Sequence, residues 1–422
     1  MTDRRPLDGN PVRTAPFPTW PIHGDAEREY LTQVLESGVW SEPAGGPFIT
    51  AFEEGFAGLS GANRGVAVTN GSIALMLCLR ALGIGAGDEV IVPAYTFLAT
   101  ATAVLEANAL PIFADIDPGT YCIDPAAVEA LITPRTKAII PVHLGGHPVD
   151  MDRLQEIADR HGLAIIEDAA HAHGAVWNDR PTGSMGVFGC FSMQASKNLT
   201  GGEGGIVTTQ HDDLAEKIRS LRNCGRVQGG AWYEHHLMGG NYRLSEFHAA
   251  VLLAQLERYP DQLARRDANG RYLDAGLAEI EGIIPQALDH RTSIHARHLY
   301  SFRVDAAAFN GLTRNEFVGL LKAEGIPCSS GYAIPLDRQP VFRQRAFDVK
   351  ATGWDPAYGP TRFGELHLPV TQLICDEVVW ISQNVLLGEE TDMDDVVTAV
   401  EKIQQAISQH GVATLRSNQT PA

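Results

Sequence analysis

Cysteine is scarce in this chain, and its six residues are widely spaced. They occupy positions 78, 122, 190, 224, 328 and 375, and no two of them form a C-x-x-C pair. In a chain of 422 residues this spacing argues against a disulfide framework and against a cysteine-based zinc site. The pattern predicts reduced, individually buried thiols, as in a cytoplasmic protein.

Long apolar runs and an excess of positive charge are also missing. No stretch of 18 apolar residues occurs, and the opening segment, MTDRRPLDGNPVRTAPFPTWP, lacks the apolar centre of a signal peptide. Lys and Arg number 33 against 51 Asp and Glu, which gives a formal net charge of −18 at pH 7. A surface this acidic repels phosphate backbones and anionic lipids. We therefore expect a soluble, cytoplasmic protein with neither a nucleic-acid partner nor a membrane partner.

What the chain does contain is typical of an α/β enzyme. Hydrophobic residues make up 44% of it, and glycine is plentiful. Short apolar runs alternate with helical patterns; the expected strands are 66–69, 88–94, 110–116, 136–143 and 163–170, and the expected helices include 71–83 and 96–109. Continuous apolar strands predict a mostly parallel sheet with helices on both faces.

Changes in composition divide the chain into four expected parts. Residues 1–22 form a Pro-rich arm, and residues 23–255 form the large α/β domain. Residues 256–409 follow from a long helical stretch (about 247–280) into a smaller α+β domain, which a helix over 392–409 closes. Residues 410–422 are polar and are expected to form a loose tail.

Two charged residues lie where an α/β enzyme places its chemistry. Asp168 ends the apolar run LAIIED, at the carboxyl end of a strand, where open sheets bind ligands. It could hold a ring nitrogen protonated, or it could merely cap the following helix. Lys197 lies in CFSMQASKNLTGGEGG, and by itself it could be an ordinary surface residue. The small neighbours Ser192 and Ser196 and the glycine loop at 201–205 favour a lysine that a cofactor can approach.

Other residues supply the remaining groups that a cofactor site needs. Gly71 and Ser72 open a helix after VAVTN, and the free N–H groups there either bind a phosphate or serve an ordinary Ser cap. Phe97 begins the next helix and could stack on a flat ring or belong to the core. His171 and His173 have too few carboxylate companions for a metal site, so no metal is expected. An amine, an acid, phosphate donors and a flat side chain are what a pyridoxal 5'-phosphate (PLP) site requires.

Several long motifs carry a resemblance to a known family. They occur in the order GDEVIVPAYTFLATATAV, ADIDPGTYCIDPAAVE, TKAIIPVHLGG, IIEDAAHAHGA, FSMQASKNLTGGEGGIVTT and GGNYRLSEFHAAVL. From about Trp20 to Ile407 the chain resembles the DegT/DnrJ/EryC1/StrS family of sugar and cyclitol aminotransferases. The resemblance implies a PLP-dependent aminotransferase (transaminase) of fold type I, with a large α/β domain and a smaller C-terminal α+β domain.

The resemblance also implies a role for individual residues. The catalytic lysine that joins the cofactor's aldehyde is Lys197, and the catalytic acid on the pyridine nitrogen is Asp168. His171 lies close to the phenolic oxygen, where many relatives have Gln, and Phe97 stacks on the ring. The phosphate ligands are Gly71, Ser72 and Ser192, together with Asn241 from a second subunit. The family pattern therefore implies a homodimer with two shared active sites.

Three segments resemble one branch of the family. FPTWP, SLRNCGR and WISQNVLLGEE are similar to members that act on scyllo-inosose, deoxy-scyllo-inosose and aminohydroxybenzoate precursors, and that branch commonly uses L-glutamine as amino donor. Many nucleotide-sugar members carry HYPxPLH, whereas this chain reads SGYAIPLDRQPVF, with Gly331 and Asp337 in place of both histidines. These features favour a free cyclitol or sugar ketone as acceptor, in aminocyclitol, amino-sugar or antibiotic biosynthesis, with L-glutamine or L-glutamate as donor.

Three alternatives remain from the sequence. A nucleotide-linked keto sugar could be the acceptor instead. The family's PLP-dependent sugar dehydratases replace the lysine by histidine, and this chain has Lys197 there. A non-catalytic PLP-binding regulator would need a DNA-binding domain, for which the sequence leaves no room at either terminus, and its net charge of −18 is unfavourable for DNA binding.

Overall fold

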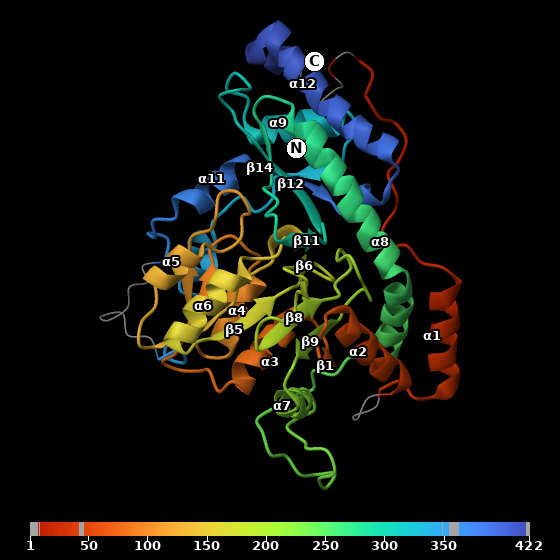
Figure 1. Cartoon of the computed structure of the whole chain (residues 1–422), viewed down its shortest axis with the longest axis vertical. Coiled ribbons are helices and arrows are strands. Elements are labelled where there is room, and N and C mark those ends of the chain that lie inside the picture. Colours follow the sequence, from red (N-terminus) through yellow and green to blue (C-terminus); the bar gives the residue numbers. More distant parts are fainter. Residues whose placement is uncertain (1–6, 8, 42–45, 348, 354–362, 419–422) are drawn as a thin grey trace.

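A seven-stranded sheet forms the centre of the larger part of the molecule (Figure 1). The computed structural model describes residues 7, 9–41, 46–347, 349–353 and 363–418. In spatial order the strands of this sheet are β1 (Arg64–Val68), β9 (Gly205–Thr209), β8 (Phe188–Ser192), β5 (Ala164–Asp168), β4 (Thr136–Ile139), β2 (Glu89–Pro93) and β3 (Leu110–Ala114). Neighbouring strands are parallel from β8 to β3, and β9 runs antiparallel to both β1 and β8. The mostly parallel sheet predicted from the sequence is confirmed.

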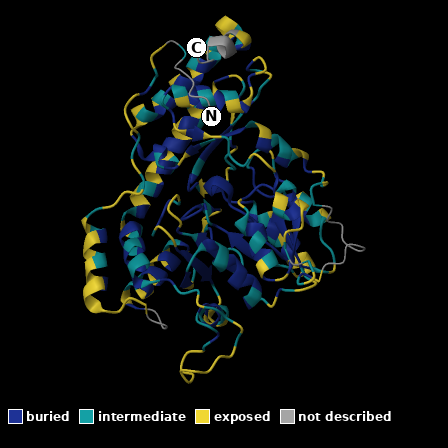
Figure 2. Cartoon of the chain, turned by 180° about the vertical axis from the view of Figure 1, so that it is seen from behind, coloured by how far each residue is buried: buried dark blue, intermediate teal, exposed yellow. Residues whose placement is uncertain are grey.

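Helices cover both faces of this sheet, so alternate side chains of one strand enter different hydrophobic cores. Val90 and Val92 of β2 pack into one core and Ile91 into another. The helices of this part are α2 (Pro47–Leu59), α3 (Gly71–Ala81), α4 (Ala99–Glu106), α5 (Pro125–Ala130), α6 (Met151–His161) and α7 (Asp212–Arg222), with a 3-10 turn, η1 (Leu144–Gly146). Before them α1 (Asp25–Ser37) lies on the outside, and Figure 2 shows how much of it is exposed.

A long helix, α8 (Glu246–Ala278), leads from the large sheet to a smaller C-terminal part (Figure 1). The sheet there is antiparallel, in the order β10 (Ile283–Pro285), β12 (Leu299–Val304), β14 (Val378–Ser382) and β13 (Cys328–Ser329). Around it lie α9 (Arg314–Ala323), η2 (Leu336–Arg338), α10 (Pro340–Arg343), α11 (Pro369–Glu377), η3 (Val385–Leu387) and α12 (Glu390–Asn418). A third, small sheet has the order β11 (Thr292–Ile294), β6 (Val176–Trp177) and β7 (Arg180–Pro181).

The structure refines two of the expected boundaries. The limit between residues 255 and 256 falls inside α8, which is continuous across it, so the division into two domains there stays a prediction. The expected loose tail over 410–422 stays a prediction as well. After a break at Gly411, where φ is +71°, α12 continues to Asn418. Residues 419–422 lie outside the described part.

The N-terminal arm is anchored on the C-terminal part of the chain. The backbone N–H of Arg13 donates to the Glu324 carbonyl at 3.0 Å, and its guanidinium bonds Asp392 at 2.6 Å and Asp395 at 2.8 Å. Phe17 packs against the core that α9 and α12 share. These contacts place the following Trp20 at the mouth of the cavity described below. Within the described residues, no helix combines the length and apolarity that a membrane crossing demands.

Candidate active site

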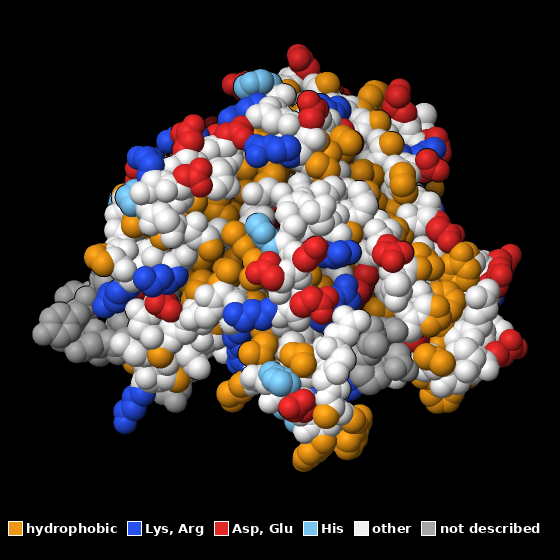
Figure 3. Space-filling view, turned by 60° about the horizontal axis from the view of Figure 1, so that its bottom comes forward, with side chains coloured by type: hydrophobic (Ala, Val, Ile, Leu, Met, Phe, Trp, Pro, Cys, Tyr) orange, Lys and Arg blue, Asp and Glu red, His pale blue; other side chains and the backbone are white. Residues whose placement is uncertain are grey.

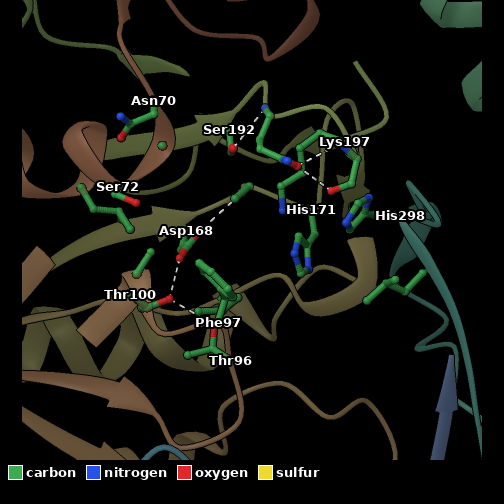
Figure 4. A pocket seen from close by; sticks show the side chains of 18 of the residues that line it. Asn70, Ser72, Thr96, Phe97, Thr100, Asp168, His171, Ser192, Lys197 and His298 are labelled. Atoms are coloured by element: carbon green, nitrogen blue, oxygen red, sulfur yellow. Dashed lines mark hydrogen bonds between the residues drawn. The ribbon is translucent and has the colours of Figure 1, made fainter. Parts of the chain in front are cut away.

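One cavity of about 840 Å³ opens at the carboxyl ends of the parallel strands, against the edge of the smaller sheet. Its size lies in the usual range for small-molecule sites. From the larger part it is lined by Asn70, Gly71, Ser72, Thr96, Phe97, Thr100, Asp168, His171, Ser192 and Lys197, and from the rest of the chain by Trp20, His298, Tyr332, Trp380 and Gln383. Figure 4 labels His298 and all of the first group but Gly71. The fold thus brings together every predicted site residue except Asn241.

Asp168 lies at the end of β5, and its carboxylate is held from both sides. Thr100 donates its hydroxyl to Oδ2 at 2.8 Å, and the backbone N–H of Ala170 donates to Oδ1 at 3.2 Å. Burial raises the pKa of Asp168, while these two hydrogen bonds and the charge of Lys197 oppose that shift. The carboxylate is therefore a fixed, largely desolvated group in the cavity wall.

Lys197 follows β8, the strand beside β5, and its side chain lines the same cavity (Figure 4). Burial lowers the pKa of Lys197 to about 8, and the negative charge of Asp168 opposes that shift. Among the described residues no hydrogen-bond or ion-pair partner holds its Nζ. An unpaired amine with a pKa this close to neutrality can act as nucleophile or base.

The N-terminus of α3 presents free donors to the cavity. Asn70 caps the helix by accepting the N–H of Ile73 on its side chain at 2.9 Å and the N–H of Ala74 on its carbonyl at 3.1 Å. The N–H groups of Gly71 and Ser72 have no acceptor among the described residues, so they can bind an anion. A Cβ at Gly71 would lie 2.8 Å from the Cβ of Ser192, so the helix start packs directly against the end of β8.

Phe97 and His171 complete the predicted set. The Phe97 ring is 61% exposed although it stands in the cavity wall, where an open flat face can stack on another ring. The backbone N–H of Gly145 donates to His171 Nδ1 at 3.3 Å, so Nε2 carries the proton of the neutral ring. Burial lowers the pKa of His171 well below its usual value, and Lys197 adds to that shift. His171 is a neutral hydrogen-bond donor.

Several residues of the wall were not predicted from the sequence. Thr100 holds Asp168 and shares a hydrogen bond of 3.0 Å with Thr96, and Tyr332 lies close to Phe97 with 6.5 Å between ring centroids. The spacing of Thr96 and Thr100, one helical turn apart after a strand, is the signal that could have indicated the first pair. In the described part of the chain, no three His, Cys, Asp or Glu side chains gather into a metal site.

Asn241 does not line the cavity of its own chain. It is exposed at the base of the segment between α7 and α8, paired with Asn223 in an isolated bridge. The segment projects from the body of the molecule (Figure 1), and Figure 3 shows hydrophobic side chains gathered at its tip. Trp232, Tyr233 and Met238 of this segment are 79%, 78% and 92% exposed. The predicted role of Asn241 in a second subunit stays a prediction.

Comparison with known proteins shows which family has this arrangement of residues. The model of the DegT/DnrJ/EryC1/StrS aminotransferase family matches residues 21–401. The chain belongs to this family. Its members are aminotransferases of the PLP-dependent type, so the predicted enzyme class is confirmed.

Individual relatives extend over nearly the whole chain. An L-glutamine:2-deoxy-scyllo-inosose aminotransferase of Streptoalloteichus tenebrarius is 40% identical over 419 residues, which cover 94% of this chain and 96% of the relative. The crystal structure of 3-amino-5-hydroxybenzoic acid synthase has 36% identity and a TM-score of 0.83, and the match covers 94% of this chain and all of that one. DesI, solved in the presence of its TDP-sugar product, has 31% identity and a TM-score of 0.80, with 97% and 98% covered.

Proposed function

We propose that this family member transfers an amino group from L-glutamine, or from L-glutamate, to the ketone of a free cyclitol or sugar of the scyllo-inosose type. The proposal rests on one observation: the Lys197 amine, which has no hydrogen-bond partner among the described residues, and the buried Asp168 carboxylate line the same cavity. The names of relatives about 40% identical over most of the chain support the donor and the acceptor class.

The residues present fit PLP as the cofactor. Lys197 would join its aldehyde, Asp168 would bind its pyridine nitrogen, and the exposed Phe97 ring would stack on it. The free N–H groups of Gly71 and Ser72, with the nearby Ser192 hydroxyl, would hold the phosphate. His171 would donate its Nε2 proton to the phenolic oxygen.

The chain's own groups then supply the acid–base chemistry. PLP, when bound, supplies an electron sink that weakens the Cα–H bond of the donor amino acid. Lys197, with its pKa lowered to about 8, can take the proton from that Cα and return it. Asp168, fixed by Thr100 and Ala170, keeps a negative charge where a ring nitrogen must stay protonated.

The loop at 330–337 supports a free ketone over a nucleotide-linked one. Gly331 has a φ of +62°, and a Cβ there would lie 2.9 Å from Val378 and 3.0 Å from both Trp380 and the Tyr95 hydroxyl. A histidine could not enter this position without moving the wall. Asp337 is buried and does not line the cavity. The loop therefore lacks both basic side chains of the nucleotide-sugar pattern, and neither Gly331 nor Asp337 supplies a basic group in their place.

A two-step assay tests the proposal. L-glutamine should convert the yellow holoenzyme to its aminated form, followed by absorbance, and scyllo-inosose or 2-deoxy-scyllo-inosose should then return the original spectrum. The same aminated enzyme should react with a TDP-linked keto sugar at a clearly lower kcat/KM. A higher kcat/KM for the nucleotide-linked ketone would favour the alternative acceptor, for which the likeness to DesI is the supporting observation.

We further propose a homodimer with shared sites, in which Asn241 reaches the phosphate of the partner subunit. Trp232, Tyr233 and Met238 of the same segment are exposed apolar side chains of the kind that a second copy buries. Subunits of Asn241→Ala and Lys197→Ala, each deficient alone, should recover activity when mixed. In a randomly reassorted pool half the dimers are mixed and each has one intact site, so roughly a quarter of all sites should be active.

Formation of mixed dimers has to be verified first, by native mass spectrometry of differently tagged subunits. A pool of two Lys197→Ala preparations should recover nothing. If verified mixed dimers of the two different variants show no activity above the single variants, Asn241 acts within its own chain or outside the site.

A further inference from the structure

Gln383 presents a fixed hydrogen-bond donor to the cavity. It directly follows β14, lines the cavity and is only 2% exposed. Its Oε1 accepts hydrogen bonds from Arg266 Nε at 2.9 Å and Nη2 at 2.6 Å. A guanidinium can only donate, so the amide cannot be turned round. The Nε2 group must therefore point away from Arg266, and no acceptor among the described residues meets it.

Arg266 serves to hold this amide. Its side chain is fully buried, and no carboxylate of the described residues lies within ion-pair distance of it. Burial lowers the pKa of Arg266 to about 10, which still leaves it charged at neutral pH. The guanidinium lies 5.1 Å from the Trp20 ring, so the arm closes over it. A buried cation whose side-chain contact is an amide oxygen locks that amide in one orientation.

His298 presents a fixed acceptor. Asn198 donates a hydrogen bond from its Nδ2 to the Ala296 carbonyl at 2.6 Å, so its Oδ1 faces His298 Nδ1 at 3.1 Å and accepts a hydrogen bond from the Nδ1–H group. The ring must then carry its proton on Nδ1. Burial lowers the pKa of His298 well below its usual value, with His171 and Lys197 adding to the shift, so the ring is neutral. Its Nε2 is left with a lone pair, and no donor among the described residues meets it.

The two residues flank the same end of one strand pair. Leu299 of β12 and Ser382 of β14 are partners in the antiparallel ladder. His298 directly precedes Leu299 and Gln383 directly follows Ser382, so both residues leave the ladder at the same end. Both line the cavity. One donor and one acceptor, each locked by a buried partner, thus line the cavity at the same end of this strand pair.

We propose that Gln383 and His298 together bind one hydroxyl group of the ketone acceptor. The hydroxyl oxygen accepts from Gln383 Nε2, and its hydrogen donates to His298 Nε2. A carboxylate has no hydrogen to give, so it would face the lone pair of His298 uncompensated. The pair therefore selects a polyol over the amino-acid donor, with Arg266 and Asn198 as positioning residues. This specificity rests on the proposed transfer to a cyclitol or sugar ketone.

Two variants and separate half-reactions test this inference. Gln383→Glu keeps an oxygen for Arg266 but removes the donor, and His298→Phe keeps a ring but removes the acceptor. With each, kcat/KM for scyllo-inosose should fall at least about tenfold, as for one lost hydrogen bond in a closed site. The inhibition constant of scyllo-inositol, which has no ketone to react, should rise similarly. The rate of the L-glutamine half-reaction should stay within about twofold.

Gln344→Glu is the matched control, because it makes the same change at an exposed position. It should alter none of the three quantities. Loss of the L-glutamine half-reaction with an unchanged ketone half-reaction would show that the pair binds the donor's carboxylate and would overturn the inference. Unchanged ketone kinetics in both folded variants would also overturn it, while leaving the proposed function intact. If the unmodified enzyme aminates no cyclitol or sugar ketone, the proposed function itself fails and the inference fails with it.

Discussion

Replacing Lys197 by alanine should abolish covalent capture of PLP and lower turnover by several orders of magnitude. The amine that would bind the aldehyde and the base that would move the Cα proton are the same group, so both roles disappear together. Borohydride reduction of the unmodified holoenzyme should fix the cofactor on the peptide that contains Lys197. The variant should give no such peptide by mass spectrometry, and its single-turnover rate with L-glutamine should be near the background.

Lys137→Ala is the control for this prediction, since Lys137 is an exposed lysine on β4. It should keep both the labelled Lys197 peptide and normal turnover. Near-normal turnover of Lys197→Ala without added amines would refute the assignment. Partial rescue by a small primary amine would support the proton-transfer role specifically, because a free amine can replace a base without restoring the covalent link.

Much of the fold could be predicted because its strands are short continuous apolar runs. The segment 88–94 was expected as a strand and forms β2 (Glu89–Pro93); the segment 71–83 was expected as a helix and forms α3 (Gly71–Ala81). The direction of β9 could not be predicted, since pairing depends on the path of the chain between strands and not on the local pattern. The composition changes near 255, but α8 continues because Leu263, Leu273 and Leu277 are buried beyond that point.

For the site, too, residues that local patterns mark could be predicted, and contacts between distant segments could not. Asp168 and the start of α3 could be located because the end of a strand and the start of a helix are local features with known chemistry. Thr100 could not be linked to Asp168, which is 68 residues away, without the sheet that brings them together. Gln383 and His298 depend on the register of β12 and β14, which no pattern in either segment specifies.

Changing Asp168 to asparagine should lower kcat more than about 100-fold, because about 3 kcal/mol of transition-state stabilisation is lost. Asparagine keeps the shape, and the Thr100 hydroxyl can rotate to accept from it. What is lost is the negative charge, held in a desolvated wall where a charge-assisted contact to a protonated ring nitrogen is strongest. The L-glutamine half-reaction, measured by stopped-flow absorbance, should slow with little change in its KM.

Thr100→Val tests how much the hydrogen bond to Asp168 contributes while the negative charge of Asp168 is kept. It removes the 2.8 Å hydrogen bond to Oδ2 but leaves the carboxylate in place, so its cost should be about 1.5 kcal/mol, clearly below that of Asp168→Asn. The two effects should not add, because Thr100 acts through Asp168 and has little left to support once the charge is gone. If Asp168→Asn binds PLP more weakly but keeps its kcat at saturating cofactor, Asp168 is an anchor for the ring and does not stabilise the charge that develops during the reaction.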